Sequence, residues 1–141
     1  MNFELLEWAG AEGELNTRPL LIRFREFPKG FPKSNYPQRL NIFWKMSEPD
    51  ENGLPTDEEF SRLAAFEDRL INAVEHDEHS ILVAALTCNG AKEFVFQTAD
   101  APGFMERLTR MPQEKERYPI TIQEYDDVDW SYFNAVIPEA G

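Results

Sequence analysis

Five stretches of the chain have the pattern of a β-strand: most carry apolar residues at alternating positions, and Ser80–Cys88 is nearly all apolar, as expected of a central strand. In the first of them Leu20, Ile22 and Phe24 lie on one side, and arginines share the other. The predicted strands are Pro19–Phe27, Gln38–Ser47, Ser80–Cys88, Lys92–Thr98 and Tyr118–Tyr125.

The dipeptide Asn89-Gly90 separates the third predicted strand from the fourth. It predicts a two-residue hairpin turn, because a type I′ turn needs positive φ at both central residues. A turn of this length would place Ala85 opposite Phe94 and Val83 opposite Phe96.

Two stretches have the spacing of an amphipathic helix. Thr56 with Glu59 three residues later forms a capping box, and the helix is expected to run from Asp57 to Glu75. Its expected buried stripe is Phe60, Leu63, Ala64, Leu70, Ile71 and Val74, with Glu67 at the edge. A second helix begins after the capping residue Asp100 and is stopped by Pro112.

The order of these elements predicts a fold class. Without the first strand, the order is βαββαβ, the repeat of ferredoxin-like folds. We therefore expect an α+β, ferredoxin-like sandwich with an additional N-terminal strand and two helices on one face of a mainly antiparallel sheet. The chain is read as one domain over 1–141, with an N-terminal arm or short edge strand (1–16), a core (17–125) and an acidic-aromatic tail (126–141). The second face of the sheet is open unless the arm or the tail covers it.

Composition places the chain among compact proteins. Hydrophobic residues make up 42% of the 141 residues, which is enough for one core. No apolar run approaches the length of a membrane span, and the acidic N-terminus does not have the pattern of a signal peptide. With Cys88 as the single cysteine, these features favour a cytoplasmic protein.

The net charge of −12 is unevenly distributed along the sequence. Residues 17–45 contain seven basic residues and one acidic residue, whereas residues 48–78 contain eleven acidic and two basic residues. A strongly acidic chain argues against duplex nucleic acid as a partner, because neutralising phosphates supplies most of the affinity of such complexes.

No motif in the sequence indicates catalysis or a cofactor. His76 and His79 lie three apart among carboxylates, a spacing that can hold a metal, but a solvated helix end explains the same residues. Cys88 has no activating neighbour in sequence. We therefore expect no catalytic residue, cofactor or metal.

The favoured function is a non-catalytic binding or regulatory module whose partner is another protein. The acidic helix face would meet a basic surface, and aromatic residues after the last strand would either pack over the sheet or anchor the contact. The expected contact residues are Asp57, Glu58, Glu67, Asp68, Trp130, Tyr132 and Phe133, with Glu75 on the same helix.

The alternative function uses the open face of the sheet. A small ligand, a single-stranded nucleic acid or a substrate would bind there, and the strand containing Phe94 and Phe96 has a faint likeness to RNA-recognition modules. The basic residues of this alternative site are Arg23, Arg25, Arg39 and Lys45, beside Thr121 and Gln123. Pairing of two open faces in a homodimer is a third possibility.

Several short motifs together resemble the bacterial domain of unknown function 695. They are Asn52-Gly53-Leu54-Pro55-Thr56 with Glu58-Glu59, Leu63 with Glu67-Asp68, Asn89-Gly90 with Glu93-Phe94-Val95-Phe96, and Asp129-Trp130 with Tyr132. The resemblance spans roughly Pro19 to Phe133. Members of that family are sometimes associated with a domain similar to the inhibitor B protein of ribonuclease E, itself a small acidic α+β protein. The resemblance implies no activity, substrate or catalytic residue.

Overall fold

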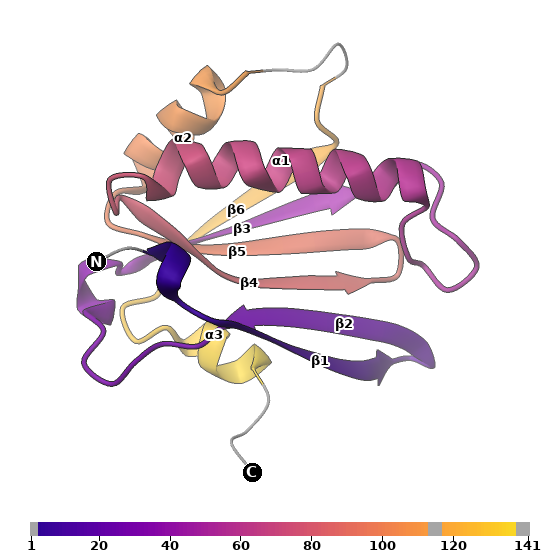
Figure 1. Ribbon diagram of the computed structural model, residues 1–141, viewed down its shortest axis with the longest axis horizontal. Coiled ribbons are helices and arrows are strands. Elements are labelled where there is room, and N and C mark those ends of the chain that lie inside the picture. Colours follow the sequence, from indigo (N-terminus) through magenta and orange to yellow (C-terminus); the bar gives the residue numbers. More distant parts are fainter. Residues whose placement is uncertain (1–2, 113–116, 138–141) are drawn as a thin grey trace.

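The computed structural model describes residues 3–112 and 117–137. Within them, six strands form one antiparallel sheet, in the order β1-β2-β4-β5-β3-β6 (Figure 1). The strands are β1 (Trp8–Leu15), β2 (Arg18–Arg25), β3 (Gln38–Lys45), β4 (Ser80–Cys88), β5 (Ala91–Thr98) and β6 (Ile120–Asp126). The helices are α1 (Asp57–Glu75), α2 (Ala101–Arg110) and α3 (Ser131–Val136), with short 3-10 turns η1 (Phe3–Leu5) and η2 (Lys33–Asn35).

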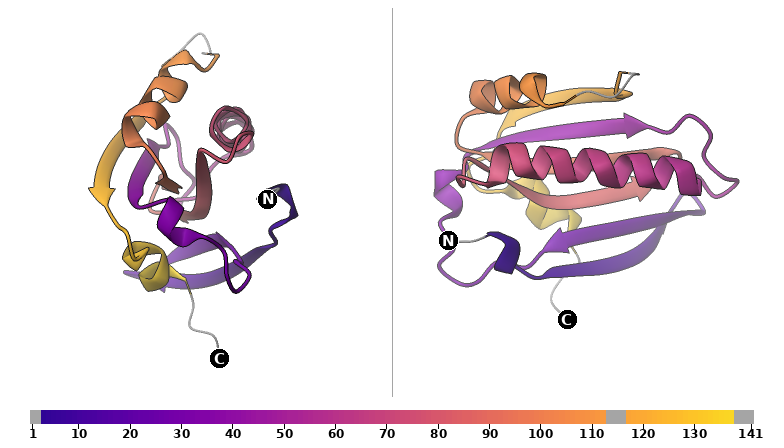
Figure 2. Two further views of the ribbon diagram at one scale, coloured as in Figure 1. Left: turned by 90° about the vertical axis from the view of Figure 1, so that its left-hand side faces the viewer. Right: turned by 45° about the horizontal axis from the view of Figure 1, so that its top comes forward.

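The segment from β3 to β6 has the predicted βαββαβ arrangement. Its strands lie in the order β4-β5-β3-β6, and each neighbouring pair is antiparallel. Both long helices, α1 and α2, cover one face of this sheet, as Figures 1 and 2 show. The α+β fold class expected from the sequence is confirmed.

The N-terminal part adds two strands: β2, the first predicted strand, and β1, an edge strand formed by residues that the sequence left as an arm or a short edge strand. β1 and β2 form a hairpin whose turn residues Asn16 and Thr17 both have positive φ. β2 then pairs antiparallel with β4, so the hairpin extends the sheet at the β4 edge. As a result, β2 and β3 are separated by the β4–β5 hairpin although they are neighbours in sequence.

The β4–β5 hairpin has the predicted turn, with φ of 51° at Asn89 and 79° at Gly90. Ala85 lies opposite Phe94, as predicted. The predicted pairing of Val83 with Phe96 is wrong: a bulge shifts the register, and Leu82 takes the place opposite Phe96. The bulge gives β4 one extra residue relative to β5.

Helix α1 spans the predicted residues, and the side chain of Thr56 accepts a hydrogen bond from the amide of Glu59. The reciprocal half of the capping box is not formed with Thr56, because the Glu59 carboxylate accepts a bond from the amide of Ser47 at 2.6 Å. α2 begins after Asp100, whose side chain makes no capping bond. Among the described residues, no helix is both long and apolar enough to span a membrane.

Each face of the sheet carries its own hydrophobic core. The core under α1 and α2 is built on Leu40, Ile42, Trp44, Phe66, Phe94, Phe96 and Phe104, all fully buried. The core on the second face lies under α3 and the segment before β3 (Figure 2, left), and Phe3 of η1 packs into it. Its buried residues include Phe3, Phe31, Tyr36, Ile81, Val83, Val95, Trp130 and Phe133. The second face is therefore covered at one end of the sheet.

Candidate interaction surface

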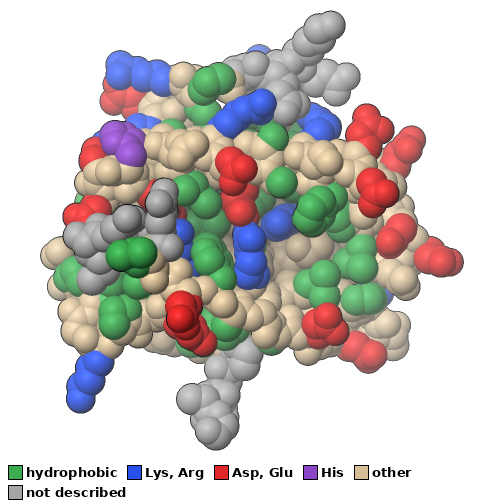
Figure 3. Space-filling model, in the orientation of Figure 1, with side chains coloured by type: hydrophobic (Ala, Val, Ile, Leu, Met, Phe, Trp, Pro, Cys, Tyr) green, Lys and Arg blue, Asp and Glu red, His purple; other side chains and the backbone are tan. Residues whose placement is uncertain are grey.

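An apolar patch lies between α1 and β2, on the helix-covered side of the sheet. Phe60 is 60% exposed and Ala64, one turn later on α1, is also exposed. On β2, Leu21 is 36% exposed, and it lies on the same face as Arg23, which reaches α1. Figure 3 shows hydrophobic side chains on both sides of the space between these two elements. We call Leu21, Phe60 and Ala64 the apolar patch.

Exposed carboxylates surround this patch at one end of the sheet. The β1–β2 turn, the β4–β5 turn and the connector between β3 and α1 all meet at this end (Figure 1). Figure 3 shows the acidic side chains gathered there, at the right of the view. The acidic end consists of Glu12, Glu14, Glu48, Asp50, Glu51, Asp57 and Glu58, all exposed.

Hydrogen bonds to the backbone fix the connector that carries three of these seven carboxylates. The amide of Gly90 donates to the carbonyl of Gly53, and the amide of Met46 donates to the carbonyl of Gly90. At the tip of the neighbouring hairpin, Arg18 donates to the carbonyl of Glu51 at 2.9 Å. The acidic end is thus held in place by three chain segments that are distant in sequence.

Two of the acidic residues expected on the outer face of α1 are used internally. Glu67 forms an ion pair with Arg23, and Glu75 accepts two bonds from Arg25 at 3.0 and 3.1 Å. The guanidinium groups of both arginines stack on the ring of Trp8, at 4.6 and 4.8 Å. Arg25 and Glu75 are buried, and burial raises the pKa of the Glu75 carboxyl against the opposing effect of Arg25.

The four basic residues of the alternative site do not share one surface. Arg23 and Arg25 face α1, because they lie on the helix-covered side of β2. Arg39 and Lys45 lie on the opposite face of the sheet, on β3. The interpretation of these four residues as one open basic face is therefore wrong.

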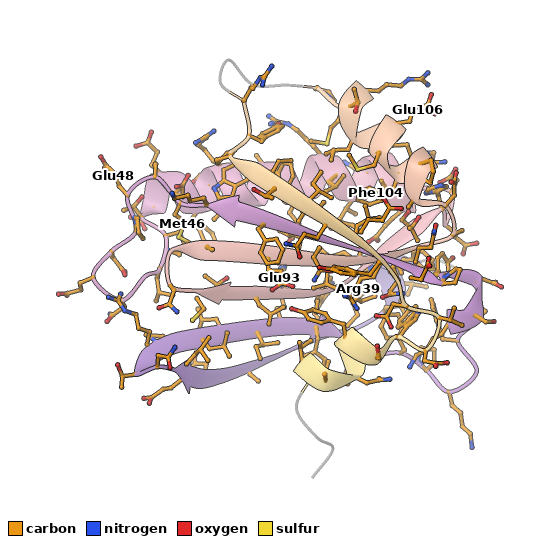
Figure 4. The ribbon with its side chains drawn as sticks, turned by 180° about the vertical axis from the view of Figure 1, so that it is seen from behind. Arg39, Met46, Glu48, Glu93, Phe104 and Glu106 are labelled. Atoms are coloured by element: carbon orange, nitrogen blue, oxygen red, sulfur yellow. The ribbon has the colours of Figure 1, made fainter. Side chains whose placement is uncertain are left out.

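On that opposite face, Arg39 is the centre of a hydrogen-bonded cluster (Figure 4). Its guanidinium donates to Asp127 and Asn41 at 2.7 Å each and lies between the rings of Tyr125 and Tyr132, 4.5 Å from each. Glu93, labelled beside it in Figure 4, accepts bonds from Asn41 at 2.6 Å and Tyr132 at 2.5 Å. The cluster ties α3 to the sheet and gives Arg39 a structural role.

Residues 7–136 match the family described as "Family of unknown function (DUF695)". The chain belongs to this family. The search of curated proteins and the search of solved structures found no match. The DUF695 match extends over both added N-terminal strands and α3, so it includes all the elements that form the acidic end.

The aromatic residues after β6 pack over the sheet in this DUF695 domain, which is one of the two arrangements that the sequence left open. Trp130 is fully buried, its indole donates to the carbonyl of Tyr36 at 3.0 Å, and Phe133 is 3% exposed. Tyr132 is half-buried in the Arg39 cluster, where burial and the bond to Glu93 raise its pKa. These three side chains are structural and do not extend the exposed patch.

The side chains of the histidine-rich segment at the end of α1 contact different partners. His79 contacts Ser80 at 2.7 Å and lies 3.7 Å from Asp100, while Asp77 pairs with Arg107. The Arg107 side chain holds the pKa of Asp77 well below its usual range. Within residues 3–112 and 117–137, no three His, Cys, Asp or Glu side chains come together to hold a metal.

Sequence reasoning placed Phe60 and Ala64 in the buried stripe of α1, and both are exposed. The buried stripe instead contains Leu63, Phe66, Leu70 and Val74. The heptad-like spacing of Leu63, Phe66, Leu70 and Val74 is the signal that identifies this stripe. Phe60 is then left at its edge and becomes a candidate contact residue.

Proposed function

We propose that this DUF695 domain is a non-catalytic binding module that docks on a basic surface of another protein through the apolar patch and the acidic end. The observation that carries the proposal is Phe60, a phenylalanine 60% exposed one turn into a helix, beside exposed Ala64 and Leu21. Of the sequence-predicted contact residues, Asp57, Glu58 and Asp68 are exposed on the same helix.

The composition of this surface favours a protein partner. Single exposed apolar residues are common, but an aromatic residue within a contiguous patch and a polar rim is the usual anatomy of an interface. Aromatic anchors at the centre of such a patch dominate binding, and water exclusion by the surrounding residues strengthens them. Phe60 is the largest side chain of the patch, and the exposed carboxylates of Asp57 and Glu58 precede it in the first turn of α1.

The negative charge of the acidic end indicates which kind of partner surface binds there. Seven exposed carboxylates at one end attract lysine and arginine side chains and raise the rate of encounter with a basic surface. They also oppose the pairing of two copies through this end, because like charges would meet. The expected partner is therefore a different protein, with an apolar pocket bordered by basic residues.

A photo-crosslinking amino acid at position 60 tests the proposal in lysate of the source cells. The matched control is the same amino acid at position 128, because Val128 is a comparably exposed hydrophobic residue (58%) remote from the patch. We expect a discrete crosslinked protein at position 60 alone, whose yield falls at high salt and with Asp57→Lys/Glu58→Lys. The charge control is Asp126→Lys/Asp129→Lys. Identical products at positions 60 and 128, no product at 60, or a product insensitive to Asp57→Lys/Glu58→Lys would contradict the proposal.

A further inference from the structure

Strand β1 forms one margin of the sheet, and one of its two edges is unpaired. Its residues pair with β2 without interruption, from Trp8 opposite Arg25 to Leu15 opposite Arg18. On its other side, no strand within the described residues pairs with β1, which lies at the end of the strand order (Figure 1). A free strand edge presents a row of backbone donors and acceptors to which an extended chain can bind.

Three of the features that usually block such an edge are missing from β1. A proline removes a backbone donor, a lysine repels basic neighbours, and a bulge twists the strand away from an incoming one. β1 contains neither proline nor lysine, and its register with β2 has no bulge. The edge is therefore open to a strand of another chain.

The β1–β2 turn determines the direction of the backbone groups along β1. Residues 16–17 form a two-residue turn, so Leu15 and Arg18 flank it as a hydrogen-bonded pair. In antiparallel strands such pairs alternate with pairs that share no hydrogen bond. The alternation reaches the start of the hairpin, where the amide of Glu26 donates to the carbonyl of Glu7 at 2.9 Å. Every second residue counted back from Leu15 thus points its backbone groups toward β2.

The residues between them, Gly10, Glu12 and Glu14, therefore point their amides and carbonyls to the free edge. Their side chains lie on the helix-covered face, because Trp8, two residues before Gly10, packs against the core under α1 and α2. All three residues are exposed. Glu12 lies opposite Leu21, so the outward-pointing edge borders the apolar patch.

The two carboxylates select the kind of strand that this edge accepts. Neither Glu12 nor Glu14 has an ion-pair partner among the described residues. Two copies of β1 paired antiparallel would bring four carboxylates onto one face, and like charges on facing strands are destabilising. A strand with basic residues at the facing positions would pair opposite charges instead. Gly10 has no side chain, and an aromatic residue on the neighbouring strand covers an edge glycine well.

We propose that an extended segment of the partner protein adds to β1 as an antiparallel strand, with basic residues opposite Glu14 and Glu12 and an aromatic residue opposite Gly10. Because the added strand runs against β1, its sequence pattern is basic, any, basic, any, aromatic. This inference rests on the function proposed above, since Glu12 and Glu14 belong to the acidic end. It adds the conformation and the residue pattern of the segment that binds there.

Titration of the purified domain with a synthetic peptide, followed by amide NMR, tests the edge. The probe is acetyl-Thr-Lys-Val-Lys-Val-Phe-Thr-amide. The control, acetyl-Thr-Val-Lys-Lys-Phe-Val-Thr-amide, has the same composition but places its two lysines on opposite faces of a strand. We expect saturable shifts in residues 8–14 with the probe and at least tenfold weaker binding of the control. The amides of Gly10, Glu12 and Glu14 should exchange more slowly in the complex.

N-methylation of the probe separates strand addition from charge attraction alone. A methyl group on the amide of the second lysine removes a hydrogen bond to β1, because this residue faces Glu12. A methyl group on the amide of the second valine points away from β1. We expect the first peptide to bind at least tenfold more weakly than the probe and the second to bind like it.

Glu12→Lys/Glu14→Lys is the matching protein variant and should weaken probe binding at least tenfold. The control Glu124→Lys/Asp126→Lys makes the same charge change at two exposed residues of β6, the other edge strand, and should bind like the wild type. Equal binding of the probe and the control peptide, no loss with the methylated lysine, or unchanged binding by Glu12→Lys/Glu14→Lys would overturn the inference.

The failure of this inference is distinguishable from the failure of the proposed function. A crosslinked partner at position 60 without probe binding would overturn strand addition and leave the protein contact in place. Probe binding at β1 without a crosslinked partner at position 60 would support strand addition and contradict the docking through Phe60.

Discussion

The amide of Gly90 donates a hydrogen bond of 2.8 Å to the carbonyl oxygen of Gly53. This bond joins the two Asn-Gly dipeptides of the chain, one in the connector before α1 and the other in the β4–β5 turn. Both motifs belong to the group of residues that resembles the family, and the fold brings them into contact. Their shared role is to hold the connector against the end of the sheet.

Gly53→Ala should therefore lower the free energy of unfolding by about 2–4 kcal/mol. Gly53 has a φ of 79°, and a Cβ there would lie 2.9 Å from the Cα of Asn89, which belongs to the backbone and cannot move aside. Urea denaturation measures the change. Gly13→Ala is the control, because no atom lies within 4 Å of the added methyl, and it should change stability by less than about 0.5 kcal/mol. Equal effects of the two substitutions would contradict the packing argument.

Replacing Arg25 alone should lower the free energy of unfolding more than replacing both Arg25 and its ion-pair partner Glu75. Arg25→Met leaves the Glu75 carboxylate buried without its partner, at an expected cost of about 3–5 kcal/mol. Adding Glu75→Gln removes that charge and keeps an acceptor for the amide of Leu82, which now donates to Glu75 at 2.8 Å. We expect the double variant to recover part of the lost stability in urea denaturation. A double variant as unstable as the sum of the two single variants would show that the pair is not coupled.

Trp130→Ala should cost about 3–5 kcal/mol, because a fully buried indole leaves a large cavity in the second core. Its ring packs against Phe27 at 5.0 Å and Phe133 at 5.8 Å. The matched control is Tyr125→Ala, since Tyr125 is an aromatic residue 43% exposed, and it should cost less than about 1 kcal/mol. Thermal and urea unfolding of both variants measure the difference. A mild effect of Trp130→Ala would mean that the indole of Trp130 does not stabilise the second core.

Tyr36 makes the stability of the fold depend on pH in alkaline solution. Burial and the nearby Glu78, Asp77 and Glu75 raise its pKa from 10.0 to about 12. In the unfolded chain the hydroxyl loses its proton near pH 10, whereas in the folded chain it keeps the proton until about pH 12. The unfolded state thus binds fewer protons in this window, and stability falls as pH rises.

The stability difference between the wild type and Tyr36→Phe should therefore be constant below pH 10. Between pH 10 and 12 it should shift against the wild type by up to about 1.4 kcal/mol per pH unit. Urea denaturation at a series of alkaline pH values measures both proteins. Parallel stability curves over this window would show that the hydroxyl is not perturbed.

The sequence predicted local structure more successfully than it predicted the contacts between elements. The span of α1, the Asn89-Gly90 turn and the βαββαβ order follow from periodicity and turn chemistry within short windows, and all three are confirmed. The register of β4 was missed because the bulge beyond Leu82 leaves no clear mark in its apolar sequence.

The candidate site is formed by elements that are distant in sequence. Hydrophobic periodicity within a short window does not indicate which of these elements lie together. Arg23 and Arg39 look alike in sequence, on consecutive predicted strands with alternating side chains. Their separation arises from the register of the sheet: Arg23 lies opposite Ala85 on the helix-covered face, and Arg39 lies on the other face. Likewise, Glu75 is buried only because Arg25, fifty residues earlier, reaches it. Such partners become visible only when the strand order is known.

The docking of the β1–β2 hairpin on β4 also imposes an order on folding during synthesis. β2 is complete at Arg25, but the residues with which it pairs extend from Ala84 to Cys88. A ribosome adding about 5–20 residues per second needs several seconds to make the intervening chain. Until then the hairpin is an isolated two-stranded unit, which is only marginally stable in water. The N-terminal strands are thus made first and reach their final place only after the fourth strand has emerged.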